Sequence, residues 1–192
     1  HKALSWEGGF RVPGIFCWPG QIPAGTTCRG VTLSMDLLPT FVALAGGEPS
    51  RDRMIDGRNL CPWLRGEAGE ASPHETFFYY RGNYLNAVRS GDWKLFVSRA
   101  RNPDDSEQDI LELYDLKNDV GETVNLAGRH PDVVARLQQR LAECREDLGD
   151  ERLGIAGRHV RPIGRVTTPR PLTNYDPAHP YLCAEYDLSD AG

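Results

Sequence analysis

Residues 77–98 read Phe77-Phe-Tyr-Tyr-Arg-Gly-Asn-Tyr-Leu-Asn-Ala-Val-Arg-Ser-Gly-Asp-Trp-Lys-Leu-Phe-Val-Ser98, and this stretch predicts the fold. Three short runs rich in aromatic and β-branched residues, at 77–80, 85–89 and 93–98, are separated by Arg-Gly-Asn and Ser-Gly-Asp. Glycine beside asparagine or aspartate favours tight hairpin turns. We therefore expect antiparallel strands joined in sequence, with residues 110–116 as a further strand.

A clear helical pattern lies downstream, at residues 131–148. His130-Pro131 marks its start and Gly149 its end. Its apolar residues recur at helical spacing, at Val133, Val134, Leu137, Leu141, Cys144 and Leu148. A small antiparallel sheet covered by such a helix is an α+β arrangement, and this is the fold class that we predict.

The upstream part predicts less regular elements. Within residues 6–19, two glycines precede a short aromatic and β-branched run that is typical of a buried strand. Residues 34–47 predict a helix, with Ser34 or Asp36 as its N-cap and a stop at Gly46-Gly47. The proline-rich residues 150–192 show little periodicity and predict an extended tail.

Composition excludes several functional classes. Of the 192 residues, 40% are hydrophobic and 26% charged, and the net charge of -5 comes from interspersed acids and bases. That pattern indicates a globular chain and disfavours a nucleic-acid partner. No apolar run approaches the roughly 20 residues that span a bilayer. The five cysteines form no C-x-x-C pair, so we expect most of them to be buried apolar residues, with one disulfide as an alternative.

Four segments, in this order and spacing, resemble the sulfatase family, the arylsulfatase-like branch of the alkaline phosphatase-like superfamily. In the first, residues 1–13, Lys2 stands five residues before Glu7-Gly-Gly, and Arg11 follows. The others are Trp18-Pro-Gly-Gln-Ile-Pro-Ala-Gly25, Met35-Asp-Leu-Leu-Pro-Thr40, and residues 87–95 together with 112–116 and 121–126.

This resemblance implies a domain organisation. Residues 1–70 would be the last segment of the catalytic α/β domain. Residues 71–149 would form the C-terminal subdomain of antiparallel sheet and helix, and residues 150–192 the tail. Because His1 already lies inside the first motif, we expect a partial chain whose partner is the N-terminal remainder of the same protein.

The resemblance also implies sulfuric ester hydrolysis with a formylglycine nucleophile and calcium or a similar divalent ion. Formylglycine is made in the family from Cys/Ser-x-Pro-Ser/Ala-Arg. Cys17-Trp-Pro-Gly-Gln lacks the Ser-Arg, Cys61-Pro-Trp has proline misplaced, and Gly47-Glu-Pro-Ser-Arg51 has glycine at the nucleophile position. The acidic residues 104–107 fit no standard calcium loop and predict a solvated loop. We therefore expect the nucleophile and the metal ligands to lie outside this chain, with no metal ligand within it.

Lys2 is the candidate catalytic and sulfate-binding residue that carries over from the family motif. A lysine ammonium is a compact charge suited to an anionic oxygen, although a terminal lysine can also be disordered. His1 is a second candidate for substrate contact. Glu7 and Arg11 are expected to be structural, with Glu7 accepting hydrogen bonds from loop N–H groups. The other histidines, His74, His130, His159 and His179, are expected at the surface or in caps, and residues 174–181 form either an ordered coil or part of a substrate mouth.

Three functional hypotheses follow. The first is the C-terminal part of a sulfatase with a sulfate ester substrate, inactive alone. The second is a phosphonate or phosphate monoester hydrolase of the same superfamily. The third is a non-catalytic binding module.

Overall fold

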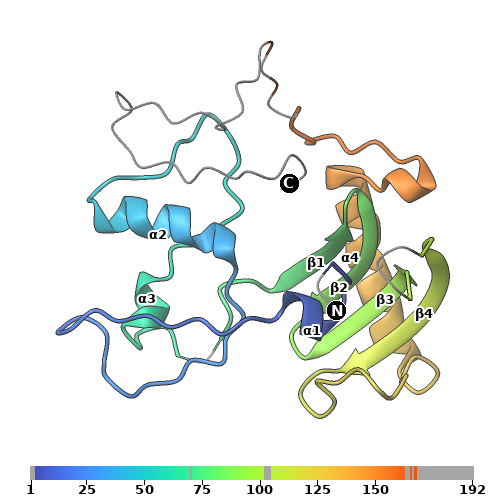
Figure 1. The fold of residues 1–192 in the computed structure, drawn as a ribbon, viewed down its shortest axis with the longest axis horizontal. Helices are drawn as coiled ribbons and strands as arrows, with labels where there is room; N and C mark the ends of the chain where they lie inside the picture. The colour runs from blue at the N-terminus through green and yellow to red at the C-terminus, as the bar shows by residue number, and fades with distance from the viewer. Residues whose placement is uncertain (1–2, 70, 102–104, 163–164, 166, 168–192) are drawn as a thin grey trace, which may run out of the picture. The chain divides into compact units, whose positions relative to one another are not determined.

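Four consecutive strands form one antiparallel sheet in the order β1-β2-β3-β4 (Figure 1). The computed structural model describes residues 3–69, 71–101, 105–162, 165 and 167. The strands are β1 Thr76–Arg81, β2 Tyr84–Ser90, β3 Trp93–Arg99 and β4 Gln108–Asp115. Gly82 and Gly91 adopt φ values of 57° and 60° in the two tight turns, a region that glycine enters without a steric cost. The predicted strands and hairpin turns are confirmed.

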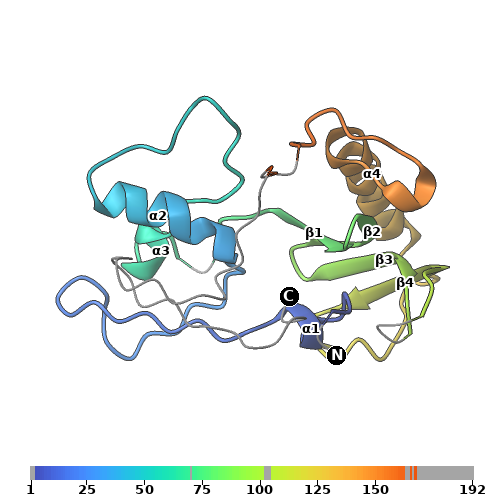
Figure 2. The same cartoon turned by 45° about the horizontal axis from the view of Figure 1, so that its top comes forward.

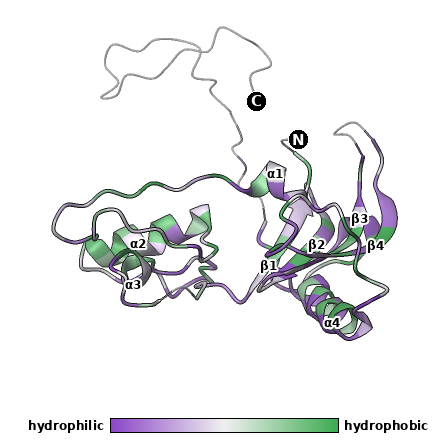
Figure 3. Ribbon diagram, turned by 90° about the horizontal axis from the view of Figure 1, so that it is seen from below, coloured by the Kyte–Doolittle hydropathy of each residue, from purple (hydrophilic) through white to green (hydrophobic). Residues whose placement is uncertain are grey.

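Helix α4, Pro131–Leu148, covers one face of this sheet (Figure 2). The predicted apolar stripe is buried from Val133 to Cys144, whereas Leu148 in the last turn is 44% exposed. Green and purple alternate along α4 in Figure 3, as expected for an amphipathic helix. The shared core consists of Leu85, Val88, Leu95, Leu113, Val133, Val134, Leu137, Leu141 and Cys144. The α+β fold class is confirmed.

The opposite face of the sheet is covered by the N-terminal segment, which includes the short helix α1, Glu7–Phe10 (Figure 2). Trp6 packs on Phe96 with a centroid distance of 5.1 Å. The β1–β2 pairing passes from Ala87 to Leu85, so Asn86 is an extra residue in β2, a β-bulge. A second core on this face consists of Tyr79, Ala87, Phe96, Tyr114 and Leu116, with Trp6, Phe77 and Ile110 at its edge.

Helices α2, Leu37–Leu44, and α3, Cys61–Leu64, lie between α1 and the sheet in sequence. Asp36 ends the 3₁₀ turn Ser34–Asp36 and occupies the N-cap position of α2. It is fully buried, and its carboxylate accepts hydrogen bonds from the N–H groups of Leu33 and Arg58, both at 2.7 Å. The predicted helix is confirmed. A Cβ at Gly57 would lie 2.1 Å from the Met35 carbonyl oxygen, so only glycine fits at this position of the loop.

The buried strand predicted within residues 6–19 is wrong. Residues 11–18 have no regular structure, and Val12 and Ile15 are 80% and 92% exposed. An extended segment with no neighbouring strand leaves its backbone groups unpaired, so it does not persist as a strand. Several apolar residues of α2 are exposed as well, among them Leu38 and Phe41.

Cysteine burial is also only partly as expected. Cys61 and Cys144 are buried, whereas Cys17 and Cys28 are exposed, and all four are free thiols. Cys183 lies outside the described residues. Among the described helices, none is long and apolar enough to cross a membrane.

Residues 150–160 contact the end of α4 and the turn between β1 and β2. Asp150 pairs with Ile155 in a short bridge, a 3₁₀ turn spans Glu151–Leu153, and the Arg158 N–H donates to the Glu146 carbonyl oxygen at 3.0 Å. The described residues up to Val160 form one compact unit. The domain boundaries at 70/71 and 149/150 stay predictions.

Replacing Leu137 with Ala should lower the free energy of unfolding by about 2–5 kcal/mol, because Leu137 is fully buried between α4 and the sheet. Urea denaturation measures this loss. Gln138→Ala, at an exposed position of the same helix, is the control and should change stability by less than about 0.5 kcal/mol. Equal losses in the two variants would contradict the placement of α4.

Candidate functional site

A buried lysine lies at the centre of the sheet face that carries the N-terminal segment. Lys94 belongs to β3 and has no solvent-exposed surface. Its Nζ donates hydrogen bonds to the Ser5 carbonyl oxygen at 2.7 Å and to Glu7 Oε1 at 3.0 Å, and forms an ion pair with Glu122 Oε1 at 2.8 Å. Of the three N–H donors of the ammonium, two therefore have acceptors at Ser5 and Glu7, and the Glu122 carboxylate balances the charge as an ion pair. Such pairing is what makes a buried charge tolerable.

Glu7 is the meeting point of this cluster. Its Oε1 also accepts a hydrogen bond from the Tyr79 hydroxyl at 2.7 Å, and its Oε2 lies 3.4 Å from Arg89 Nη1. Its own backbone N–H donates to Glu122 Oε2 at 2.7 Å. Glu7 is therefore structural, as expected, but its carboxylate binds side chains of the sheet rather than the loop N–H groups that we predicted.

The cluster shifts the pKa values of its members. Burial alone would raise the pKa of Glu7, but Lys94, the Tyr79 hydroxyl and Arg89 together bring it below its ordinary value. Burial lowers the pKa of Lys94, and Glu7 and Glu122 offset that effect only in part. Burial, together with the Glu7 charge, raises the pKa of Tyr79, which stays a neutral donor. The geometry thus places the Lys94 Nζ between the carboxyl groups of Glu7 and Glu122.

The turn that supplies Glu122 is held in an uncommon backbone conformation. Glu122 has a φ of 55°, in the left-handed region that costs a non-glycine residue roughly 1–2 kcal/mol. Asp119 stabilises the turn, because its Oδ2 accepts hydrogen bonds from the N–H groups of Thr123 and Val124, both at 2.8 Å. These contacts lower the pKa of Asp119 through the Val124 and Thr123 N–H groups. The Asp119 contacts hold Glu122 in this uncommon conformation, in which its carboxylate lies 2.8 Å from Lys94 Nζ.

The bulge in β2 extends the cluster. Ser5 Oγ donates to Asn86 Oδ1 at 2.7 Å, and Asn86 Nδ2 donates to Ser98 Oγ and to Glu107 Oε2, both at 2.9 Å. Glu107 in turn pairs with Arg81 at 3.0 Å. Because the side chain of Glu107 is 3% exposed, the prediction of a solvated loop is wrong for this residue of the acidic run.

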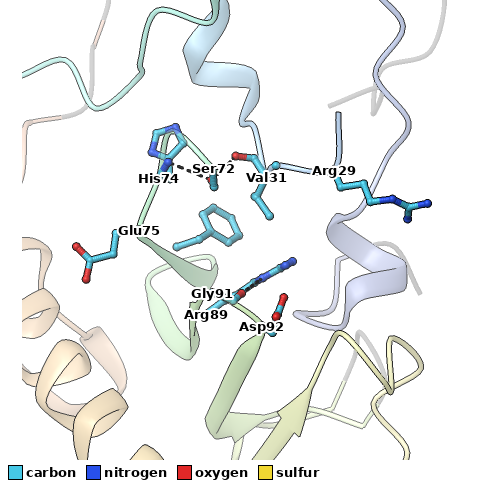
Figure 4. Close-up of a pocket in the computed structure, with 10 residues that line it drawn as sticks. Arg29, Val31, Ser72, His74, Glu75, Arg89, Gly91 and Asp92 are labelled. Carbon is cyan, nitrogen blue, oxygen red and sulfur yellow. Dashed lines mark hydrogen bonds between the residues drawn. The ribbon is translucent and has the colours of Figure 1, made fainter. Parts of the chain in front are cut away.

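A pocket of roughly 160 Å³ shares Arg89 with the surroundings of Glu7. Figure 4 shows the side chains that line it. It is lined by Arg29, Gly30, Val31, Ser72, His74, Glu75, Phe77, Arg89, Gly91 and Asp92. Several of its polar groups are engaged within the chain. Arg89 donates to the Gly91 carbonyl oxygen, Glu75 pairs with Arg140, and Ser72 Oγ donates to the Val31 carbonyl oxygen. The guanidinium of Arg29 points away from the other labelled side chains in Figure 4. The pocket therefore offers neither a free nucleophile nor a converging cationic site.

The two predicted substrate-contacting residues, Lys2 and His1, lie outside the described residues. So do His179 and residues 174–181. Arg11 has a half-exposed side chain and pairs with Glu7 at 3.3 Å. The sequence pattern thus brings Glu7 and Arg11 together, at the C-terminal side of the motif that begins with Lys2.

The remaining candidates differ in their outcome. His159 is exposed, as predicted, and pairs with Asp147. His130 occupies the N-cap position of α4 without a side-chain cap bond and packs on Trp93 at 4.8 Å between ring centroids. His74 is not a surface residue, because its side chain is 9% exposed and Nε2 lies 2.7 Å from buried Asp36 Oδ1.

The described residues do not fit the cofactors of the family. Within residues 3–69, 71–101, 105–162, 165 and 167, no group of three or more His, Cys, Asp or Glu side chains is arranged to hold a metal ion. Cys17 is exposed in coil, and Cys61 is buried at the start of α3. Arg51 of the Pro-Ser-Arg match pairs with Glu48 at the surface.

A family model described as the C-terminal region of aryl-sulfatase matches residues 72–167, which are 96 of the 192 residues. The chain belongs to the sulfatase family. Human arylsulfatase D is 54% identical to this sulfatase chain over 84 residues, which cover 44% of the chain and 14% of that protein.

A second human protein and a solved structure are also similar to this chain. Human steryl-sulfatase is 48% identical over 101 residues, covering 50% of the chain and 17% of that protein. The crystal structure of the PsFucS1 sulfatase from Pseudoalteromonas sp. shares the fold, with a TM-score of 0.65 at 23% identity, covering 74% of the chain and 31% of that structure. The alignments thus span 14% and 17% of the two human sulfatases.

Sequence reasoning missed Lys94 and Glu122 as members of a cluster. The available signal was a lysine flanked by Trp93 and Leu95-Phe96-Val97, in a strand that is otherwise apolar. A charge in such a run indicates that partners lie elsewhere in the chain, but not which residues they are.

The Glu7 carboxylate should make the chain sensitive to acid. Because its folded-state pKa is depressed below 4.5, Glu7 contributes stability that is present above that value and is lost as the pH falls through the folded-state pKa. Urea unfolding between pH 7 and pH 3 should therefore show a shallower acid loss for Glu7→Gln than for the wild type. Glu67→Gln, at an exposed position, is the matched control and should keep the wild-type slope. Identical slopes for all three proteins would show that Glu7 is not held as an ion.

Proposed function

We propose that this chain is the C-terminal part of a sulfatase that hydrolyses sulfate esters, and that Lys2 is its contribution to the active site. The observation that carries the proposal is the first motif. Lys2 precedes Glu7 by the spacing of the family's sulfate-binding lysine, in a chain that belongs to the family. The burial of Glu7 on the sheet supports a fixed position for the C-terminal side of this motif.

The chemistry explains why a lysine is useful there. Cleavage of a sulfate ester transfers the sulfuryl group to a nucleophile while charge shifts to the leaving oxygen. A fixed cation that is in place before the reaction stabilises such developing charge without reorganisation. We infer that the Lys2 ammonium holds a sulfate oxygen in this way. In the intact enzyme the formylglycine nucleophile and a calcium or similar divalent ion would come from the N-terminal remainder of the protein.

The exposed apolar surface supports this division of labour. Val12 and Ile15 are largely exposed in the segment after α1, and Leu38 and Phe41 are exposed on α2. Exposed apolar side chains of this kind often mark a surface that contacts another protein surface. We propose that the N-terminal remainder covers these side chains.

The chain by itself should show no turnover of a chromogenic aryl sulfate, because its described residues provide neither the nucleophile motif nor a metal site. The intact enzyme, assayed under the same conditions, is the positive control. A phosphate monoester measured in parallel separates sulfatase from phosphatase activity. Turnover by the purified chain that disappears on substitution of Cys17 or Cys61 would refute the assignment of the nucleophile to the remainder.

Replacing Lys2 with Ala in the intact enzyme should lower kcat for a sulfate ester by about a hundred- to thousandfold, as the loss of one electrostatic contact to the transition state does. Lys2→Arg should restore only part of the activity, because a planar guanidinium cannot reproduce the compact ammonium. Steady-state kinetics gives the result, with melting temperature as the folding control. Turnover of the Ala variant within about threefold of the wild type would remove Lys2 from the site.

A further inference from the structure

We propose that Lys94, Glu122 and Glu7 form a positioning device for Lys2. These three side chains, here called the Lys94 cluster, anchor residues 5–7 to the sheet and so fix the base of the segment that carries Lys2. None of the three touches substrate in this proposal. The inference rests on the proposed function of Lys2 and adds residues from β3 and from the turn after β4 that the first motif does not contain.

The cluster holds the backbone of the segment, and not only its side chains. Lys94 Nζ binds the carbonyl oxygen of Ser5, and Glu122 Oε2 binds the N–H of Glu7. Two bonds to main-chain atoms two residues apart fix the direction of the chain as well as its position. Only Ala3 and Leu4 separate Lys2 from Ser5 in sequence.

Side-chain contacts lock the same residues in place. Ser5 Oγ donates to Asn86 at 2.7 Å, and Lys94 Nζ lies 3.8 Å from the centre of the Tyr79 ring. Leu4, Ser5 and Glu7 are each 4% exposed. A segment that is buried and hydrogen-bonded on this scale has one conformation, which is what a catalytic cation needs from its support.

Charged residues hold the N-terminal segment on the sheet, and this favours a role in positioning the segment over a role in stabilising the fold. A buried ion cluster is often no more stabilising than apolar residues of the same volume, because desolvation offsets the attraction between its charges. Its hydrogen bonds are directional, however, and a shift of the N-terminal segment would break them. Apolar packing against Phe96 and Tyr114 would tolerate a shift of the segment along the sheet.

The backbone conformation of two residues also supports the positioning role. Among the described residues, the non-glycine residues with positive φ are Ala3, at 74°, and Glu122, at 55°. Ala3 directly follows Lys2, and Glu122 belongs to the cluster. Backbone strain of this kind is retained where surrounding contacts hold it, and such residues gather at functional sites.

The test is a double-mutant cycle in the intact enzyme. Lys94→Met combined with Glu122→Gln removes the central charges while keeping similar volumes. This double variant should lower kcat for a sulfate ester by about ten- to a hundredfold, the usual effect of a displaced catalytic group. In the Lys2→Ala background the same pair of substitutions should change kcat by less than about twofold, because the group that they position is already gone.

Leu137→Ala provides the matched control, since it weakens the core on the α4 face and does not touch the N-terminal segment. If it lowers the melting temperature as much as the double variant does yet keeps kcat, loss of stability does not explain the loss of turnover. Equal losses of kcat with and without Lys2, or an unchanged kcat, would overturn the positioning role. An inactive wild type, or an unaffected Lys2→Ala, would instead refute the proposed function on which the role rests.

Amide hydrogen exchange of the 192-residue chain gives a readout that does not require activity. The Glu7 amide, which donates to Glu122, should exchange at least about tenfold faster in the double variant, while the amides of Ala87 and Phe96 keep their protection. The Leu137→Ala variant should leave the Glu7 amide protected relative to those core amides. An unchanged exchange rate at Glu7 in the double variant would show that the cluster does not anchor the segment.

Discussion

A single buried ammonium determines how three distant parts of this chain meet. Lys94 has no exposed surface, and a charge in that environment must be neutralised and hydrogen-bonded. The N-terminal segment supplies its hydrogen-bond acceptors at Ser5 and Glu7, and the turn after β4 supplies its ion-pair partner Glu122. Neither of these segments is a strand of the sheet. Their contacts with Lys94 hold them against the second face of the sheet.

The two faces of the sheet consequently differ in kind. On the α4 face, apolar residues such as Leu95 and Leu137 are chemically alike, and the complementary shapes of their side chains hold the helix on the sheet. On the other face, directional contacts around Lys94 tie specific atoms together. A small shift of α4 would cost packing, whereas a small shift of the N-terminal segment would leave a buried charge unsatisfied. The part of the chain that adjoins the proposed sulfate contact is thus held by the less forgiving kind of interaction.

Elements whose causes are local could be predicted from the sequence. Gly82 and Gly91 mark the hairpins by themselves, and the apolar stripe of α4 needs no knowledge of its partner. The Lys94 cluster could not be predicted, because Glu7 and Glu122 are 115 residues apart and nothing near either one names the other. The strand expected within residues 6–19 failed for a related reason. An apolar run in a sequence predicts burial, but it does not identify the segment against which the run is buried.

The long-range contact between Glu7 and Glu122 also has a consequence for biosynthesis. A ribosome that adds roughly 5–20 residues per second needs about 6–23 seconds to make the residues between them. Lys94 and the strands on which Trp6 and Phe10 pack are made within this interval, so the Glu7 carboxylate can meet its cation before its N–H has an acceptor. The anchor of the first motif therefore stays incomplete until the turn after β4 has been translated.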